Sequence, residues 1–320
     1  MATILVTDYD YPDLSIERSV LEDTGVDLQE TEAETAGELI DAIDEHGADA
    51  LLNQHMFIGR AVFEAHPELQ VVGRYGIGID TIDLDAATEH GVYTLNVPDY
   101  CLDEVPTHAM ALILAVERKL AMYTDKIRTG TWDWTQGQPM YRLRGRTLGL
   151  VGFGKLARHL VPKAEAFGLE PIAYDPYVDE KAMENAGVEK VTFDQLLGGS
   201  DIVSVHVPLT EDTRGLLDSN AFERLNDQAT IINTSRGAVI DVDALHEAIS
   251  DGEVRGAGID VMPEEPPEHH PLFDHDAVVI SPHVAWYSEQ SIVTMRRTIT
   301  QDVLRVLQGT DPKNPINDLR

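Results

Sequence analysis

The chain has 320 residues, of which 43% are hydrophobic and 25% are charged, and this composition predicts a packed protein of about two domains. Its 56 acidic residues outnumber the 24 basic ones, and the formal net charge of -32 argues against nucleic-acid binding. Cys101 is the single cysteine, which excludes an intrachain disulfide, and without a long apolar run or a basic leader we expect a cytoplasmic protein that does not bind membranes.

The first hundred residues alternate short apolar runs with segments of helical periodicity. Strands are expected at "TILVTD", "ADALLN" and "LQVVGRYG", and helices near 14–23, up to His46 and up to about Ala65. Continuous apolar strands without polar alternation indicate a parallel sheet that is covered on both faces. This rhythm predicts one doubly wound unit.

A second unit is expected after residue 100. A long amphipathic helix over 103–130 leads to the irregular aromatic stretch "TWDWTQGQPMYRLRG", and a new series of strands and helices then runs from "TLGLVG" to about Pro282. Residues 288–308 are typical of one helix, which could pack back on the first unit. The second unit would then be inserted in the first.

A nucleotide fingerprint opens the second unit. In "LGLVGFGKLARHL", Gly152 and Gly154 stand between a strand and a helix, where bare backbone and free helix N–H groups suit a pyrophosphate. The next strand ends in Asp175, whose carboxylate would accept from both ribose hydroxyls and would disfavour a 2′-phosphate, so NAD is preferred to NADP. The alternative is that the glycines form a plain turn and that Asp175 caps a helix.

Polar residues at later strand ends are candidates for chemistry. His206 and Pro208 follow the strand "DIVSV", where ligands of open α/β sheets bind. Arg236 follows the strand "ATIIN", and its guanidinium could hold a carboxylate, although a surface arginine in a turn is the alternative. A carboxylate beside His283 would favour the protonated imidazole, which suits proton donation to a carbonyl.

The runs "NTSRGAVIDVDALHEAI", "IDVMPEEP" and "SPHVAW" resemble the D-isomer-specific 2-hydroxyacid dehydrogenases over essentially the whole chain. The resemblance implies that Arg236 orients the substrate, that Glu265 pairs with His283, and that His283 exchanges the hydroxyl proton. Asp260 would position the nicotinamide amide. The cofactor contacts that we expect are Gly152, Gly154, Lys155, Leu156, Asp175, His206, Pro208, Thr213, Thr234 and Asp260.

The resemblance also assigns a substrate loop to "GRYGIGIDTID", in which the amides of Ile77 and Gly78 could hold the carboxylate of a 2-oxo acid. The run "HVAWYSEQ" resembles the branch that contains the C-terminal-binding proteins, in which the tryptophan faces the substrate. His55 and Arg74 match further positions near that site. Trp286 would favour a small acid with an apolar side chain, unless it is a core residue.

These observations predict two doubly wound parallel-sheet α/β domains, a Rossmann NAD-binding domain (101–285) inserted in a flavodoxin-like substrate domain (1–100 and 286–320). The expected activity is reversible hydride transfer between NAD and a small 2-oxo acid. One alternative is an NAD(H)-sensing interaction protein of the C-terminal-binding type. Another is 3-phosphoglycerate dehydrogenase, which is disfavoured because we see no regulatory extension and few basic residues besides Arg74 in the first domain.

Two further expectations concern the surroundings of the protein. Acidic residues are spread over the whole chain and only seven of the basic residues are lysines, which resembles proteins of salt-loaded, halophilic cytoplasms. The aromatic insert resembles the arm through which the family forms homodimers. The histidines of "EHHPLFDH" lie in a proline-flanked loop, so we expect no metal site there.

Overall fold

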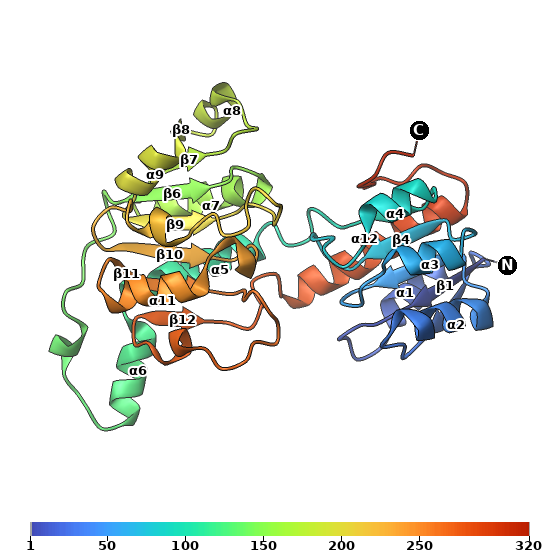
Figure 1. The fold of residues 1–320 in the computed structure, drawn as a ribbon, viewed down its shortest axis with the longest axis horizontal. Helices are drawn as coiled ribbons and strands as arrows, with labels where there is room; N and C mark the ends of the chain where they lie inside the picture. Colours follow the sequence, from blue (N-terminus) through green and yellow to red (C-terminus); the bar gives the residue numbers. More distant parts are fainter. Residues whose placement is uncertain (1, 320) are drawn as a thin grey trace. The chain divides into compact units, whose positions relative to one another are not determined.

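The computed structural model describes residues 2–319, which form two compact units (Figure 1). Unit 1 comprises the described residues up to Cys101 together with those from Ser288 onward, and unit 2 comprises Leu102–Tyr287. The chain therefore crosses between the units at 101/102 and at 287/288, where the sequence analysis placed the boundaries at 100/101 and 285/286.

Unit 1 is built on a five-stranded parallel sheet in the order β2-β1-β3-β4-β5. This is the strand order of flavodoxin-like folds, as the sequence predicted. Helix α12 packs on α1 and β4, and it approaches closely because Gly73 has no side chain: a Cβ there would lie 2.6 Å from Val303 Cγ2. The strands are β1 (Thr3–Val6), β2 (Asp27–Glu30), β3 (Ala50–Asn53), β4 (Val71–Arg74) and β5 (Tyr93–Leu95), and the helices are α1 (Ser15–Leu21), α2 (Ala36–His46), α3 (Arg60–Ala65), α4 (Leu84–Glu89) and α12 (Glu289–Leu307).

Unit 2 is built on a seven-stranded parallel sheet in the order β12-β11-β10-β9-β6-β7-β8. The chain starts in the middle of the sheet, builds outward to β8 and then returns to add β9 on the other side, which is the Rossmann arrangement that the sequence predicted. The strands are β6 (Thr147–Val151), β7 (Glu170–Tyr174), β8 (Glu189–Lys190), β9 (Ile202–Val205), β10 (Ala229–Asn233), β11 (Val254–Ile259) and β12 (Val278–Ile280), and the main helices are α5 (Glu104–Glu117), α6 (Leu120–Arg128), α7 (Lys155–Ala166), α8 (Glu180–Glu184), α9 (Phe193–Gly199), α10 (Ser219–Phe222) and α11 (Val242–Ser250).

Both faces of the unit 2 sheet are buried. Successive residues of β10 show this, because Ile231 packs in the apolar cluster on one face and Ile232 in the cluster on the other. Side chains alternate across a strand, so a sheet covered on both faces needs apolar residues at consecutive positions. This requirement explains the uninterrupted apolar run "ATII" that marked the strand in the sequence.

Local sequence signals set the ends of several helices. At the start of α2, Thr35 Oγ1 accepts from the Glu38 amide at 3.3 Å and the Glu38 carboxylate accepts from the Thr35 amide at 3.1 Å, which forms a capping box. The same helix ends at Gly47, whose φ of 59° lies in the left-handed region that glycine adopts without strain. These signals are why the predicted end of α2 agrees with the structure.

The single amphipathic helix predicted over 103–130 is wrong. The segment forms two helices, α5 and α6, which are separated at Arg118 and at Lys119, a residue in the left-handed conformation (φ 51°). Helix α5 is also buried over most of its surface, because it packs against β10, β11 and α7. A helix enclosed by its neighbours needs apolar residues all round, so its sequence carries no strong polar face.

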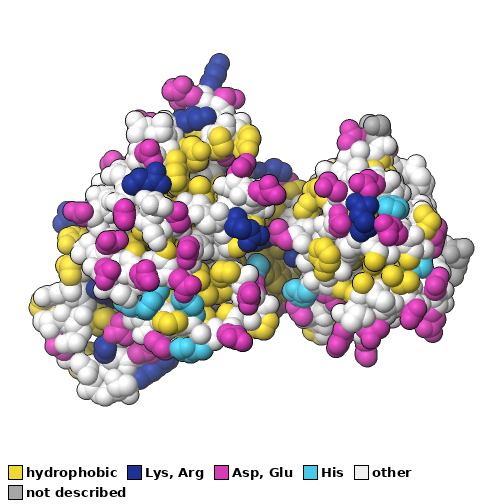
Figure 2. All heavy atoms as spheres, in the orientation of Figure 1, with side chains coloured by type: hydrophobic (Ala, Val, Ile, Leu, Met, Phe, Trp, Pro, Cys, Tyr) yellow, Lys and Arg dark blue, Asp and Glu magenta, His cyan; other side chains and the backbone are white. Residues whose placement is uncertain are grey.

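Acidic side chains are scattered over the visible surface of both units, and basic side chains are fewer (Figure 2). No helix within residues 2–319 is both long and apolar enough to span a bilayer.

Candidate active site

The glycine turn after β6 is shaped by close backbone packing. Gly152 has a φ of 92°, and a Cβ there would lie 2.9 Å from the carbonyl oxygen of His206, so a side chain is excluded. Gly154 is the N-cap of α7, and no heavy atom lies within 4 Å of the position that a Cβ on Gly154 would occupy. The helix N-terminus therefore faces open space, and the first-turn amides of an α-helix, here those from Lys155 and Leu156 onward, have no intrahelical acceptor.

Asp175 stands directly after β7 and joins the glycine turn to the next loop. Its Oδ2 accepts from the Phe153 amide at 2.8 Å, and its Oδ1 accepts from the amides of Tyr177 at 2.8 Å and Val178 at 3.1 Å. The carboxylate is thus held beside the turn at the end of the strand, the position from which a ribose is bound in Rossmann folds.

His206 follows β9 on the other side of β6. Its Nε2 lies 2.8 Å from Ser204 Oγ, and burial lowers the pKa of His206 to about 4, so the ring is neutral near pH 7. Thr213 closes the loop that follows, since its hydroxyl donates to the carbonyl of Pro208 at 2.6 Å. These three residues form a fixed wall at the carboxyl edge of the sheet.

The loop after β10 carries Thr234 and Arg236. The hydroxyl of Thr234 is buried and has no hydrogen-bond partner among the described residues, which is what a site awaiting a ligand group looks like. Arg236 Nη1 donates to the carbonyl of Ser235 at 2.8 Å. At Gly237 a Cβ would lie 2.0 Å from the carbonyl carbon of Met262, so this loop packs backbone to backbone on the loop after β11.

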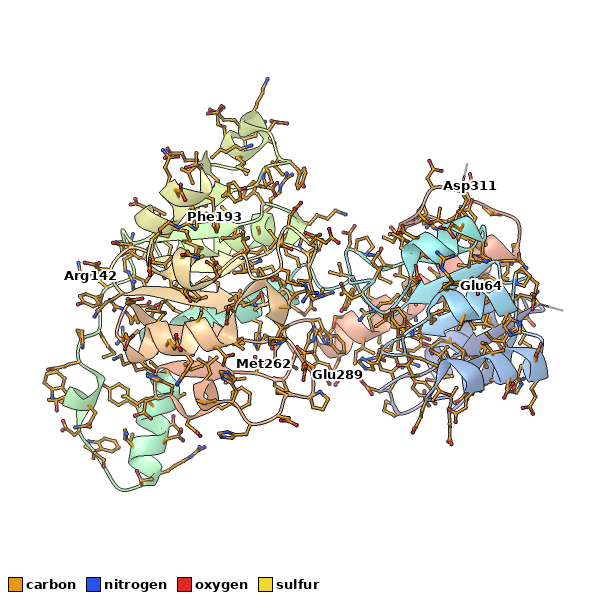
Figure 3. The ribbon with its side chains drawn as sticks, viewed as in Figure 1. Glu64, Arg142, Phe193, Met262, Glu289 and Asp311 are labelled. Atoms are coloured by element: carbon orange, nitrogen blue, oxygen red, sulfur yellow. The ribbon has the colours of Figure 1, made fainter. Side chains whose placement is uncertain are left out.

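That second loop carries Glu265, and Figure 3 labels its Met262 near the end of β11. Glu265 Oε2 lies 2.6 Å from His283 Nδ1, and Glu265 Oε1 accepts from the Met262 amide at 2.8 Å. Burial acts to raise the pKa of Glu265, but the His283 hydrogen bond and charge, the Met262 amide and Arg236 outweigh it and hold that pKa below its ordinary value. Glu265 is therefore ionised near neutral pH.

Asp260 fixes the segment that presents His283. Its carboxylate is buried and accepts from Ser281 Oγ at 2.6 Å and from the amides of Val284 at 3.0 Å and Ala285 at 2.9 Å. The His283 amide donates to the Asp260 carbonyl at 2.7 Å. The sequence predicts a role for Asp260 at the nicotinamide, whereas these contacts with the histidine loop are apparent only in the structure.

Three further side chains belong to the same network. The Nε2 atom of His108, on α5, lies 2.8 Å from Ser281 Oγ and 3.5 Å from Asp260 Oδ1. Neither His108 nor Ser281 is among the predicted site residues, and the only sequence signal for either is the position of Ser281 two residues before His283. The indole N–H of Trp286 donates to the His283 carbonyl at 2.8 Å, so this tryptophan supports the loop.

The structure thus gathers most of the predicted residues of unit 2 at the carboxyl edge of one sheet. The dinucleotide candidates follow β6, β7, β9 and β10, and the chemical groups Arg236, Asp260, Glu265 and His283 follow β10, β11 and β12. A guanidinium, an ionised carboxylate and an imidazole with two hydrogen-bonding nitrogens can bind an anion and exchange a proton. The glycine turn, Asp175 and the unpartnered Thr234 hydroxyl fit a bound dinucleotide.

The substrate candidates of unit 1 follow β3 and β4. The guanidinium of Arg74 covers Gly76, whose φ of 141° is a conformation that glycine adopts and other residues rarely do. The carbonyl of Ile77 accepts from Asn96 Nδ2 at 2.6 Å, which fixes the loop that includes Gly78. His55 Nε2 lies 2.6 Å from Asp10 Oδ2, and both side chains are exposed.

The histidine-rich loop has separate partners for its rings. His269 lies 3.2 Å from Asp274, His270 lies 3.1 Å from Asp243, and His275 Nδ1 accepts from the Ala277 amide. Within residues 2–319, no three His, Cys, Asp or Glu side chains are grouped as metal ligands would be.

Comparison with known proteins gives consistent results for sequence and structure. Residues 110–285 match the family model of the D-isomer specific 2-hydroxyacid dehydrogenase, NAD binding domain. The chain is similar to a glyoxylate reductase of Thermococcus litoralis, with 35% identity over 81% of this chain and 80% of the relative. The fold is similar to that of the TT0316 protein of Thermus thermophilus, with a TM-score of 0.87 and 29% identity over 98% of this chain and 100% of that one.

The chain is also similar to D-3-phosphoglycerate dehydrogenases. The relative from Methanocaldococcus jannaschii is 34% identical over 99% of this chain, which corresponds to 60% of the relative. The relative from Archaeoglobus fulgidus is 33% identical, and the match covers 55% of its length. The chain therefore spans little more than half the length of these relatives.

Proposed function

The chain belongs to the D-isomer-specific 2-hydroxyacid dehydrogenase family, and on this premise we propose that it is an NAD-dependent D-2-hydroxyacid dehydrogenase. The reaction is the reversible interconversion of a small 2-oxo acid and its 2-hydroxy acid. The observation that carries the proposal is the 2.6 Å contact between Glu265 and His283 on a loop fixed by Asp260. NAD, when bound, supplies the hydride donor or acceptor at C4 of its nicotinamide.

His283 exchanges the proton of the reaction. In the reducing direction it donates a proton to the oxygen that forms at C2, and in the oxidising direction it removes the hydroxyl proton. Its Nδ1 faces Glu265, so its Nε2 is the nitrogen that serves the substrate. The ionised carboxylate of Glu265 stabilises the imidazolium and orients the ring.

Arg236 holds the carboxylate of the substrate. A guanidinium presents two parallel N–H donors that match two oxygens at once, which fixes the acid relative to the proton donor. Unit 1 has its own candidates for binding an acid, which are the backbone amides of Ile77 and Gly78 and the side chains of His55 and Arg74.

Asp175 sets the preference for NAD over NADP. A carboxylate at the end of β7 accepts hydrogen bonds from ribose hydroxyls and repels a 2′-phosphate.

Trp286 favours a substrate with a small apolar side chain, because an indole fills space without a charged partner. A substrate that bears a phosphate is the second candidate, and the likeness to D-3-phosphoglycerate dehydrogenases favours it.

The proposal includes a homodimer that works in a salt-rich cytoplasm. The arm between α6 and β6 exposes Trp132 by 88% and Trp134 by 71%, and large aromatic surfaces of this kind are usually covered by a partner. The net charge of -32 is tolerable where high ionic strength screens self-repulsion. Light scattering of the full chain across a potassium chloride series tests both points.

The experiment for the activity follows NADH oxidation with glyoxylate, pyruvate, 4-methyl-2-oxopentanoate and 3-phosphohydroxypyruvate, each over a range of salt. Turnover of one or more of these acids is expected, and it should fall by about a hundredfold or more in His283→Gln while NADH binding persists. NADH binding without turnover of any acid would instead favour an NAD(H)-sensing interaction protein.

A further inference from the structure

A cavity of about 500 Å³ opens in unit 2 at the edge of the sheet opposite the candidate active site. Its wall includes Arg146 just before β6, Asp201 just before β9, Asp227 just before β10, and Arg255, the second residue of β11. The same four strands carry the active-site loops at their carboxyl ends. In Figure 3, Arg142, another wall residue, is labelled at the far edge of unit 2 from Met262.

The distance between the two sites follows from β11. Arg255 lies near the start of this strand and Asp260 follows its end, five residues later. At about 3.3 Å per residue, the cavity is roughly 17 Å from the carboxylate that fixes the His283 loop. A ligand in the cavity therefore does not contact the proposed catalytic groups.

One of the three guanidiniums in the cavity is already neutralised. Arg146 pairs with the buried carboxylate of Glu117 and also donates to the carbonyl of Asp201 at 3.1 Å. The Asp201 carboxylate accepts from the Thr147 amide at 2.9 Å and lies 3.6 Å from Arg146 Nε. The charged groups of Arg146, Glu117 and Asp201 therefore lie at the base of the cavity, and each has hydrogen-bond or ion-pair partners within the protein.

The other two guanidiniums are not paired in this way. Arg255 is held in place by packing over the Tyr141 ring at 4.2 Å and by the donation from its Nε to the Gln228 carbonyl at 3.2 Å. Arg142 is exposed at the mouth of the cavity. Within residues 2–319, neither Arg142 nor Arg255 forms an ion pair with a carboxylate.

The charge of this cavity contrasts with that of the chain. Acidic residues outnumber basic ones by 56 to 24, so a carboxylate partner would be easy to supply for any arginine that needed one. The lining carries three arginines and two aspartates, and the buried Glu117 that pairs with Arg146 balances the third arginine, so the cavity is neutral in a strongly acidic protein. A planar guanidinium presents parallel N–H donors that match the oxygens of a phosphate group.

We propose that this cavity binds a small oxyanion of the phosphate type between the guanidiniums of Arg142 and Arg255. The aromatic ring of Tyr141 and the Gln228 carbonyl hold Arg255 ready, so its guanidinium loses little freedom on binding. The volume is in the range of small-molecule sites, so a phosphate that is part of a larger metabolite also fits. The carboxylate of Asp227 repels an anion and therefore weakens the site.

The test is the line width of the phosphorus-31 resonance of inorganic phosphate, measured with the full chain at constant ionic strength. Saturating NADH is present, because the N-terminus of α7 could also bind phosphate. Specific broadening is expected with the unchanged protein, and Arg142→Gln/Arg255→Gln should weaken binding by about tenfold or more. Asp227→Asn should strengthen it, because it removes the repelling charge.

Arg297→Gln is the matched control, since Arg297 is an exposed arginine of unit 1 and should leave the broadening unchanged. Melting temperature and NADH binding check that each variant is folded. If the double variant does not fold, Arg142→Gln alone, at an exposed position, is tested in its place. The proposal is overturned if the protein with NADH gives no broadening, if the arginine variants broaden the line as the unchanged protein does, or if Asp227→Asn weakens binding.

Discussion

Asp260 and Ser281 are joined by a hydrogen bond of 2.6 Å, in which the serine hydroxyl donates to a carboxylate that is 1% exposed. The same carboxylate accepts from the amides of Val284 and Ala285, so one buried acid holds both sides of His283. The position of the proposed proton donor therefore depends on a residue that contacts it only through the backbone.

Asp260→Asn should destabilise this loop. The amide nitrogen of asparagine cannot accept a hydrogen bond. The donors that now bind one of the two Asp260 oxygens therefore lose their acceptor, at a cost of about 1–3 kcal/mol. We expect a lower melting temperature and a kcat reduced by about tenfold or more, because His283 is no longer held in place. Ser281→Ala removes one donor and should have a smaller effect. A raised Kd for NADH in Asp260→Asn would show that Asp260 also contacts the nicotinamide, and unchanged stability would contradict the argument.

Glu265→Gln should change the pH dependence of reduction. Since the pKa of Glu265 lies below its ordinary value, the carboxylate is ionised at neutral pH and loses its charge only as the pH falls through that lowered pKa. Glutamine removes the anion that contacts His283. We expect the rate of 2-oxo acid reduction to fall by about 10–100-fold at pH 7, where Glu265 is ionised, and the difference from the unchanged protein to shrink as the pH falls through the Glu265 pKa. Glu264→Gln, one residue earlier in the chain, is the control, and a loss that stays the same at low pH would argue against this role.

Asp175→Ser should relax the choice of cofactor. Without the carboxylate at the end of β7, a 2′-phosphate is no longer repelled, so the ratio of kcat/KM for NADPH to that for NADH should rise by about tenfold. The same change removes an acceptor for three backbone amides, so some loss of stability is expected too. Asp179→Ser, at the N-cap of α8, removes a neighbouring acid that also caps an amide and should leave the ratio unchanged.

His206 should make unit 2 sensitive to acid. Burial lowers its pKa from 6.5 to about 4, so the unfolded chain binds this proton at a higher pH than the folded one. The stability from the neutral ring is present above pH 6.5 and is lost between pH 6.5 and 4, to an extent of about 3 kcal/mol. In His206→Gln the loss over that range should be smaller by a comparable amount, as measured by urea unfolding. His269→Gln, at an exposed site, should leave the loss unchanged.

The fold was predictable from the sequence because the central strands of both sheets are buried on two faces and therefore read as continuous apolar runs. The break between α5 and α6 was not, because it occurs at Lys119 in the left-handed conformation, without a glycine or proline to mark it. Local motifs also located Arg236, Glu265 and His283. The contact of His108 with Ser281 joins residues 173 positions apart, and nothing in the local sequence of either residue indicates it.

The cavity lined by Arg142 and Arg255 was also outside the reach of sequence patterns. Its wall comes from the amino ends of four strands, and strand order in a sheet is set by packing of the whole unit rather than by neighbouring residues. The arginines of "YRLRGR" are close together in the sequence, but the pairing of Arg146 with Glu117 and the packing of Arg255 on Tyr141 exist only in the folded unit.

Unit 1 contains a buried ion pair, which should be costly to break. Arg296 of α12 is 4% exposed and binds Glu17 of α1, which is fully buried, through Nε at 2.8 Å and Nη2 at 2.5 Å. Tyr75 donates to the same carboxylate at 3.1 Å. Burial acts to lower the pKa of Arg296, but the hydrogen bond and charge of Glu17 raise it overall, so the arginine stays charged. Glu17→Gln would leave this charge buried without its partner, which costs about 3–5 kcal/mol.

Two probes can separate this loss from effects on unit 2. The three tryptophans, at 132, 134 and 286, all lie in unit 2, so tryptophan fluorescence follows that unit while circular dichroism follows both. In Glu17→Gln we expect part of the unfolding transition measured by circular dichroism to shift to a lower urea concentration. The midpoint of the transition measured by tryptophan fluorescence should not change. Glu30→Gln, which breaks the exposed pair with Arg18, should cost less than about 1 kcal/mol. Equal effects of the two substitutions would show that the buried pair contributes no more than a surface one.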